Sequence, residues 1–97
     1  MMILNVKGRI LTNVENKVIL NKFYLTKQDL TFLLALIDNK AKTIKEIAEL
    51  CYGYYAPYMS RNISVMKSRI LIKTNYLLDI KNIHGVGYLL NNEILIE

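Results

Sequence analysis

The sequence predicts an α+β domain with an N-terminal four-stranded antiparallel sheet, three helices and a C-terminal β-hairpin. Three observations carry this prediction. Short runs of β-branched and aromatic residues, separated by polar turns, fill residues 2–25. Two helix-capping sequences follow, and each precedes apolar residues at helical spacing. Near the end, the segment "IHGVGYLL" places two glycines between strand-like residues.

The composition fits one domain spanning residues 1–97. A chain of 97 residues can build one hydrophobic core but not two. No run of eighteen apolar residues occurs, and charges interrupt the first twenty residues, so neither a membrane span nor a signal peptide is expected. Cys51 is the only cysteine, which excludes an internal disulfide and favours a reducing compartment. We therefore expect a cytoplasmic protein without membrane association.

The N-terminal segment, residues 2–25, is expected to form the sheet. Its turns are Lys7-Gly8, Glu15-Asn16 and Asn21-Lys22, which separate the strands at hairpin spacing. The strands predicted between them are Ile3–Val6, Arg9–Val14, Lys17–Leu20 and Phe23–Leu25. Strands this short need a partner to pack against.

The first two helices are marked by their N-terminal caps. Thr26, followed three residues later by Asp29, predicts a helix over about 27–38. The capping box Thr43-Ile44-Lys45-Glu46 predicts a second helix over about 44–51. The residues expected to point inward are Leu30, Leu33, Leu34 and Ile37 in the first helix and Ile44, Ile47, Ala48 and Cys51 in the second.

A third helix is expected over about 60–74, after the loop Tyr52–Tyr58, with Ser60 as its cap. Residues 77–90 then form a two-stranded hairpin. A dinucleotide-binding loop would need a third glycine where Leu90 stands, followed by a helix, and a P-loop would need Gly-Lys-Ser/Thr. Gly85 and Gly87 are instead attributed to positive φ at a tight turn.

Four segments resemble a known family in order and spacing. "LTKQDLTFLL" is similar to its Leu-Thr-x-x-Glu-Phe-x-x-Leu-Leu helix, and "TIKEIAELCYG" to its second helix, with Tyr52 in place of tryptophan. "SRNISVMKSRI" resembles its Arg-Thr-Val-Asp-Val-His-Ile-Ser-Arg-Leu helix, and "IHGVGYLL" its Val-Arg-Gly-x-Gly-Tyr signature. The family is the OmpR/PhoB-type winged-helix DNA-binding domain, the effector half of many response regulators.

The resemblance covers nearly the whole chain and implies a winged helix-turn-helix fold. It implies a transcription regulator that binds double-stranded DNA in a sequence-specific manner. The helix over about 60–74 would enter the major groove, and the wing over 77–90 would reach the minor groove. The charge agrees, because residues 51–92 contain five basic side chains and one acid, and a basic excess indicates a polyanionic partner. The alternative reading is a solvated basic surface.

The third helix supplies most candidate contacts. On a period of 3.6 residues, six of them fall within about 140° of arc. They are Arg61, Asn62, Val65, Met66, Arg69 and Lys73. By resemblance, Arg61 and Lys73 would bind phosphates and the other four would face bases. Arg69 suits guanine, Asn62 adenine, and the two apolar residues thymine methyl groups.

Each of these roles has a structural alternative. The arginines are otherwise solvated surface charges, Met66 a core residue and Asn62 a first-turn helix residue. His84 stands where the family has an arginine. It either enters a narrow A/T-rich minor groove or lies at a solvent-exposed hairpin tip without a binding role. Lys67 stands where the family has an apolar residue. Either its aliphatic stem lies along the core, or the helix register shifts locally. Leu71 replaces a basic phosphate-binding residue.

The expected partners follow from the same resemblance. They are A/T-rich double-stranded DNA with repeated half-sites, RNA polymerase through the Tyr54–Tyr58 loop, and a second copy in a homodimer. The tail Asn92–Glu97 either pairs between subunits or extends its own sheet. A second hypothesis is a winged-helix module that binds RNA polymerase or another regulator.

No catalytic constellation is apparent, so we expect a non-enzyme. The sequence contains no carboxylate pair, metal cluster or catalytic triad, and no cofactor or metal is expected. The receiver domain that precedes this family's DNA-binding half is absent from the sequence. Either the protein is a stand-alone regulator or the chain is a fragment of a longer one.

Overall fold

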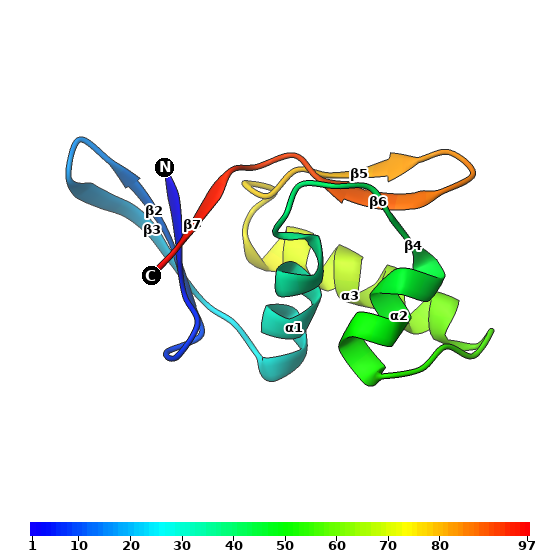
Figure 1. Ribbon diagram of the computed structural model, residues 1–97. Coiled ribbons are helices and arrows are strands. Elements are labelled where there is room, and N and C mark those ends of the chain that lie inside the picture. The colour runs from blue at the N-terminus through cyan, green and yellow to red at the C-terminus, as the bar shows by residue number, and fades with distance from the viewer.

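The computed structural model describes all 97 residues. A four-stranded sheet lies at one end of the molecule, three helices fill the middle, and a hairpin projects at the other end (Figure 1). The elements in order are β1 (Met2–Asn5), β2 (Ile10–Glu15), β3 (Val18–Tyr24), α1 (Lys27–Leu36), β4 (Lys42–Thr43), α2 (Ile44–Tyr52), α3 (Met59–Lys73), β5 (Ile80–Ile83), β6 (Gly87–Leu90) and β7 (Ile94–Ile96).

The N-terminal sheet has the strand order β3-β2-β1-β7. The two strands expected at 17–20 and 23–25 are one strand, β3, so the predicted turn at Asn21-Lys22 is wrong. Asn21 lies opposite Asn13 inside the sheet, and their side-chain amides are hydrogen bonded at 3.3 Å. An irregularity in register between Asn13 and Val14 accommodates the length of β3.

The fourth strand of this sheet comes from the opposite end of the chain. β7 pairs with β1 in parallel, with Met2 opposite Ile94. The tail therefore extends its own sheet, and the sheet is mixed rather than antiparallel throughout. Parallel neighbours need a long crossover connection, and here all the intervening helices and the hairpin supply it.

Both predicted capping boxes are present. Thr26 Oγ1 accepts a hydrogen bond from the Asp29 amide at 3.1 Å, and the Asp29 carboxylate accepts one from the Thr26 amide at 3.0 Å. Thr43 and Glu46 make the same pair of bonds at the start of α2. These local contacts satisfy amide groups that have no partner within the helix.

The start of α3 differs from the expectation. The helix begins at Met59, and Ser60 is its second residue rather than its cap. The Met59 amide donates to the Ala56 carbonyl at 2.9 Å, and the Ser60 amide donates to the Pro57 carbonyl at 3.3 Å. Because the preceding turn already supplies acceptors, the helix needs no side-chain cap.

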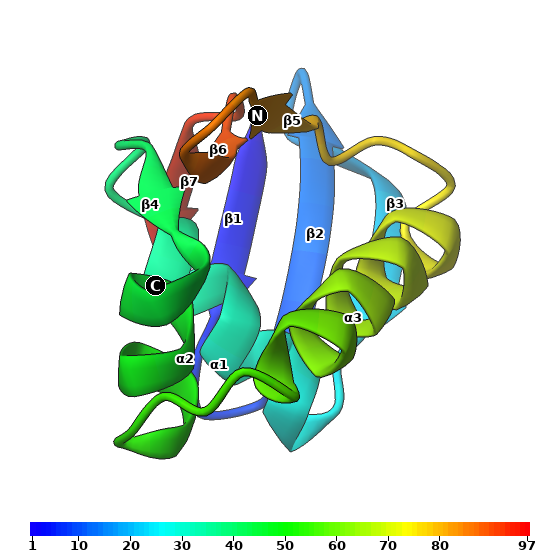
Figure 2. The same cartoon turned by 90° about the vertical axis from the view of Figure 1, so that its right-hand side faces the viewer.

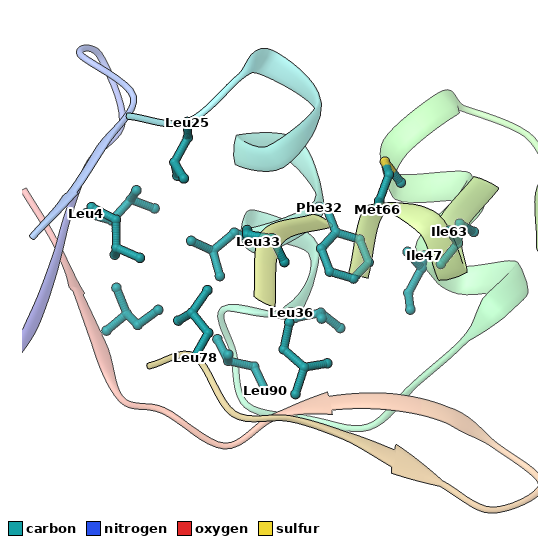
Figure 3. Packing of buried hydrophobic residues seen from close by; sticks show 14 of the residues in the cluster. Leu4, Leu25, Phe32, Leu33, Leu36, Ile47, Ile63, Met66, Leu78 and Leu90 are labelled. Atoms are coloured by element: carbon teal, nitrogen blue, oxygen red, sulfur yellow. The ribbon is translucent and has the colours of Figure 1, made fainter. Parts of the chain in front are cut away.

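The core joins the sheet to all three helices around α1 (Figure 3). Phe32, Leu33 and Leu36 are fully buried in α1. The expected inward set was only partly right, since Leu30, Leu34 and Ile37 are half-buried at the margin of the core. α1 lies between the sheet and the other two helices (Figure 1), so it is covered over a wider arc than one amphipathic stripe provides.

The hairpin of β5 and β6 is joined by β4 in a small sheet of order β4-β6-β5. Gly85 has φ +75°, as expected for the turn. Gly87 was predicted to need positive φ as well, and that prediction is wrong. A Cβ atom at Gly87 would lie 2.0 Å from the carbonyl oxygen of Lys42, so the residue is glycine because β4 approaches it closely.

Candidate nucleic-acid interface

One side of α3 packs into the core and the other side is open to solvent. Ile63 and Ile70 are fully buried, and Met59 and Met66 are nearly so. At about 100° per residue, the exposed side is centred on four residues that fall within roughly 60° of arc. They are Arg61, Val65, Ser68 and Ile72, all exposed, with Arg69 and Asn62 at their margin.

Met66 does not belong to the exposed face. Its side chain is 5% exposed and lies in the core cluster, where the Tyr52 hydroxyl donates a weak hydrogen bond to its sulfur at 3.7 Å (Figure 3). The expected base contact from Met66 is therefore corrected to a packing role. The predicted DNA-contacting arc of α3 extends too far toward the core, because it counts only Ile63 and Ile70 as inward residues.

The corrected arc adds residues that the sequence reasoning missed. Ile72 is 62% exposed and lies two turns beyond Val65 on the same side, with Ser68 between them. Their spacing of three to four residues from Arg61 onward is the signal that would have found them. The exposed face is therefore aliphatic and hydroxyl-bearing at its centre, with arginines along it.

The arginines line an open hollow of about 300 Å³ where the three helices meet. Its lining consists of Gln28, Tyr52, Arg61, Asn62, Val65, Met66 and Arg69. Neither Arg61 nor Arg69 forms an ion pair, and no acidic residue occurs in α3 or in the lining. These two guanidinium groups are thus available to an external anion or base edge.

Lys73 is engaged within the protein. Its ammonium forms an ion pair with the Asp29 carboxylate at 2.5 Å, which joins the end of α3 to the first turn of α1. Asp29 is 1% exposed. The expectation of Lys73 as a free phosphate-binding group is therefore corrected, because its charge neutralises a buried carboxylate.

The Asp29 carboxyl group has a lowered pKa. Burial alone would raise this pKa, but hydrogen bonds from Lys73 and Thr26 to the ionised form outweigh burial. Ionised Asp29 therefore stabilises the fold above its unfolded-state pKa of 3.8, and that stability is lost as the pH falls through the lower folded-state value.

We expect Asp29→Asn to lower the free energy of unfolding at neutral pH by about 1–3 kcal/mol, because a buried hydrogen-bonded partner of Lys73 is lost. The difference between wild type and variant should shrink as the pH falls below 3.8. Urea unfolding at a series of pH values measures this difference. A gap that stays constant down to the acid-unfolding range would contradict the role of the ionised carboxylate.

Lys67 joins α3 to the hairpin. Its ammonium donates a hydrogen bond to Asn82 Oδ1 at 2.6 Å and lies 4.8 Å from the centre of the Tyr88 ring. The helix register does not shift. The aliphatic stem of Lys67 therefore lies along the core, as one of the two expected arrangements had it, and its ammonium group reaches the hairpin. Leu71 is half-buried against the core. α3 and the hairpin are thereby fixed to each other.

His84 lies exposed in the turn at the tip of the hairpin, next to Gly85 and Val86. No hydrogen bond or ion pair holds its imidazole against the protein. Figure 2 views the molecule from the hairpin end, with α3 and α2 below the β5–β6 pair. The tip is therefore free to approach a ligand that lies along α3.

The loop between α2 and α3 presents three exposed tyrosines, Tyr54, Tyr55 and Tyr58. The hydroxyl groups of Tyr54 and Tyr58 are hydrogen bonded to each other at 3.0 Å. Cys51 precedes this loop, and burial raises the pKa of its thiol to about 11, so it is not an activated nucleophile.

His, Cys, Asp and Glu side chains nowhere gather in threes that would suit a metal ion. None of the helices combines the length and the apolar character needed to cross a membrane.

The N-terminal sheet, the three helices and the hairpin wing form a winged helix-turn-helix domain, so the OmpR/PhoB-type arrangement that the sequence resemblance implied is confirmed at the level of the fold. Among solved structures, the chain is similar to the DNA-binding domain of the response regulator AdeR, which was crystallised in complex with an intercistronic region. The sequences are 25% identical, the match covers 94% of each chain, and the TM-score is 0.69. No protein-family model and no curated protein matches the chain.

Proposed function

We propose that this protein is a transcription regulator that binds double-stranded DNA in a sequence-specific manner in the cytoplasm. α3 enters the major groove and the β5–β6 wing approaches the minor groove. The observation that carries the proposal is the solvent-exposed face of α3, where Arg61 and Arg69 have no protein partner and no acid is present. The AdeR domain, which has the same fold, was crystallised with DNA from an intercistronic region.

The exposed side chains divide into two kinds of contact. Arg61 at the start of α3 is assigned to phosphates, which supply most of the affinity. Arg69 is suited to the O6 and N7 atoms of guanine, and Asn62 to adenine. Val65 and the newly recognised Ile72 are suited to thymine methyl groups. His84 at the wing tip is assigned to a narrow A/T-rich minor groove.

One helix and one wing contact only a few base pairs. We therefore propose that two copies bind A/T-rich repeated half-sites, because one module alone gives modest affinity and limited choice of sequence. We assign roughly three to four phosphate contacts to one copy, from Arg61 and other basic or backbone N–H groups of α3 and the wing, and none to Lys73, which is bound to Asp29.

We expect the logarithm of the association constant to fall against the logarithm of salt concentration with a slope of about −2.7 to −3.6 per copy, since each phosphate contributes about −0.9. The measurement begins with duplexes selected from a random pool. Fluorescence anisotropy on the enriched duplex, from about 50 to about 200 mM salt, then gives the slope. Failure to enrich any sequence, or a slope near zero, would contradict the proposal.

A second candidate function is a winged-helix module that binds protein, including RNA polymerase. The three exposed tyrosines between α2 and α3 favour it, because aromatic side chains are enriched in protein interfaces. Affinity capture after nuclease treatment, with Tyr54→Ser/Tyr58→Ser as the matched variant, tests this function. A stoichiometric partner that survives the nuclease and is lost with the variant supports it, and capture that depends on DNA contradicts it.

A further inference from the structure

The four-stranded sheet has one face that no helix covers (Figure 1). Leu4 and Leu11 point to the core and are fully buried. Residues at alternate positions on the four strands point away from the helices, and six of them are apolar. The five largest, the outer apolar set, are Ile3, Ile10, Ile19, Tyr24 and Leu95, and the sixth is Val14, which lies opposite Ile19. An antiparallel sheet with one solvated face normally carries polar residues at such positions.

The outer apolar set includes exposed and half-buried side chains. Ile19 is 58% exposed, Tyr24 66% and Leu95 46%, whereas Ile3 and Ile10 are half-buried. Ile3 lies opposite Leu95, and Ile10 lies opposite Tyr24. Ile3 and Ile10 are diagonal neighbours on β1 and β2, so the set crosses the sheet as an apolar stripe beside Asn5 and Thr12. A shallow hollow of about 170 Å³ lies beside this stripe, lined by Asn5, Ile10, Thr12, Ile19, Lys22 and Glu97. An exposed apolar stripe rimmed by polar side chains is typical of an interaction surface.

The charges on this face are separated by edge. Lys22 lies on β3, which forms one edge of the sheet. Glu93 and Glu97 flank β7, which forms the other edge, and the Glu97 amide is bonded to the Leu4 carbonyl at 2.9 Å. None of these three side chains forms an ion pair within the chain. The face thus carries a lysine on one edge, an apolar stripe with Asn5 and Thr12 beside it in the centre, and glutamates at the other edge.

We propose that a second copy of this chain covers the outer face of the sheet in a symmetric homodimer. A two-fold axis parallel to the strands places the β3 edge of one protomer over the β7 edge of its partner. Lys22 then faces Glu97 of the partner subunit, and the symmetry repeats this pair on the other side. The outer apolar sets of the two sheets meet between these pairs, as in aligned sheet packing.

The charge pattern selects this axis over the other face-to-face arrangement. An axis in the same plane but perpendicular to the strands would place β3 over β3 and β7 over β7. Lysine would then oppose lysine, and glutamates would oppose glutamates, which is unfavourable. Only the parallel axis makes the face complementary to itself.

The dimer leaves the DNA-facing surfaces free. The sheet and the wing lie at opposite ends of the molecule, whose longest dimension is 43 Å (Figure 1). Self-association through the sheet therefore requires no DNA, and its failure would not affect the function proposed for α3.

Sedimentation equilibrium without DNA, at low salt and over a range of concentrations, tests the dimer. The wild type is expected to approach twice its chain mass of 11.3 kDa. Ile19→Asp is expected to remain monomeric. Lys22→Glu and Glu97→Lys are each expected to raise the dimer dissociation constant at least about tenfold, and the double reversal Lys22→Glu/Glu97→Lys to restore it, because opposite charges face each other again.

Leu50→Asp serves as the matched control, because Leu50 on α2 is as exposed as Ile19, at 58%, and α1 lies between α2 and the sheet (Figure 1). It should dimerise like the wild type, and circular dichroism checks that each variant is folded. A wild type that stays monomeric throughout, dimerisation lost equally with Leu50→Asp, or a double reversal weaker than both single ones would overturn the proposal.

Discussion

Replacing Arg61 and Arg69 together by alanine is expected to weaken binding to the selected DNA by at least about 100-fold. Both guanidinium groups lie on the exposed face of α3 without an ion-pair partner. A well-placed arginine to a base or phosphate contributes on the order of tenfold or more, and the two act at separate points of the helix. Fluorescence anisotropy at fixed salt measures the loss directly.

The double variant should leave the fold intact. Neither side chain is part of the buried core, so the free energy of unfolding should change by no more than about 0.5 kcal/mol. Lys7→Ala/Lys17→Ala is a matched control that removes the same charge from exposed positions in the N-terminal sheet region. Equal loss of affinity in this control would show that net charge alone drives binding, and undiminished binding by the arginine variant would refute the assignment of α3.

The features predicted best from the sequence depend on neighbouring residues. Each capping box joins residues three positions apart, so Thr26 with Asp29 and Thr43 with Glu46 identify two helix starts directly. The positive φ of Gly85 is likewise a property of one tight turn. The order of helices and hairpin follows from such signals, and with it the fold class.

The missed features depend on residues far apart in the chain. Extension of the sheet by residues 92–97 was one of two expected alternatives, but its parallel partner β1, at the opposite end of the chain, was not predicted. Asp29 likewise binds Lys73 over a separation of 44 residues. No local pattern identifies these partners, so the sequence reasoning assigned Lys73 to DNA. Similarly, β3 reads as two strands because Asn21-Lys22 resembles a turn, and only the pairing of Asn21 with Asn13 shows otherwise.

The error at Met66 has a different origin. A methionine at the edge of a helix face is compatible with either burial or exposure, because its side chain is flexible and apolar. When Met59 and Met66 are counted as buried together with Ile63 and Ile70, the centre of the buried face of α3 moves around the helix axis toward Met66. That single change removes one expected base contact and adds Ile72, so the candidate site could be predicted in outline but not in its composition.

Gly87→Asn is expected to lower the free energy of unfolding by about 3 kcal/mol and to detach β4 from the wing. A Cβ at this position would lie 2.0 Å from the Lys42 carbonyl oxygen and 3.0 Å from Thr43 Cα, both backbone atoms that no rotamer change can move. β4 must therefore shift, and its pairing with β6 is lost. Denaturant unfolding measures the stability, and hydrogen exchange of the amides in β4 and β6 reports the pairing.

Gly85→Asn is the matched variant, because it introduces the same side chain two residues away on the same hairpin. Gly85 has φ +75°, which asparagine tolerates better than other side chains, and nothing lies within 4 Å of its Cβ position. We expect a cost of at most about 1 kcal/mol. If Gly85→Asn proved as damaging as Gly87→Asn, turn conformation rather than the approach of β4 would explain both glycines. If only Gly87→Asn is severe, the Gly-x-Gly segment combines two separate requirements, a left-handed turn and a close contact between strands, and the second fixes the wing to the start of α2.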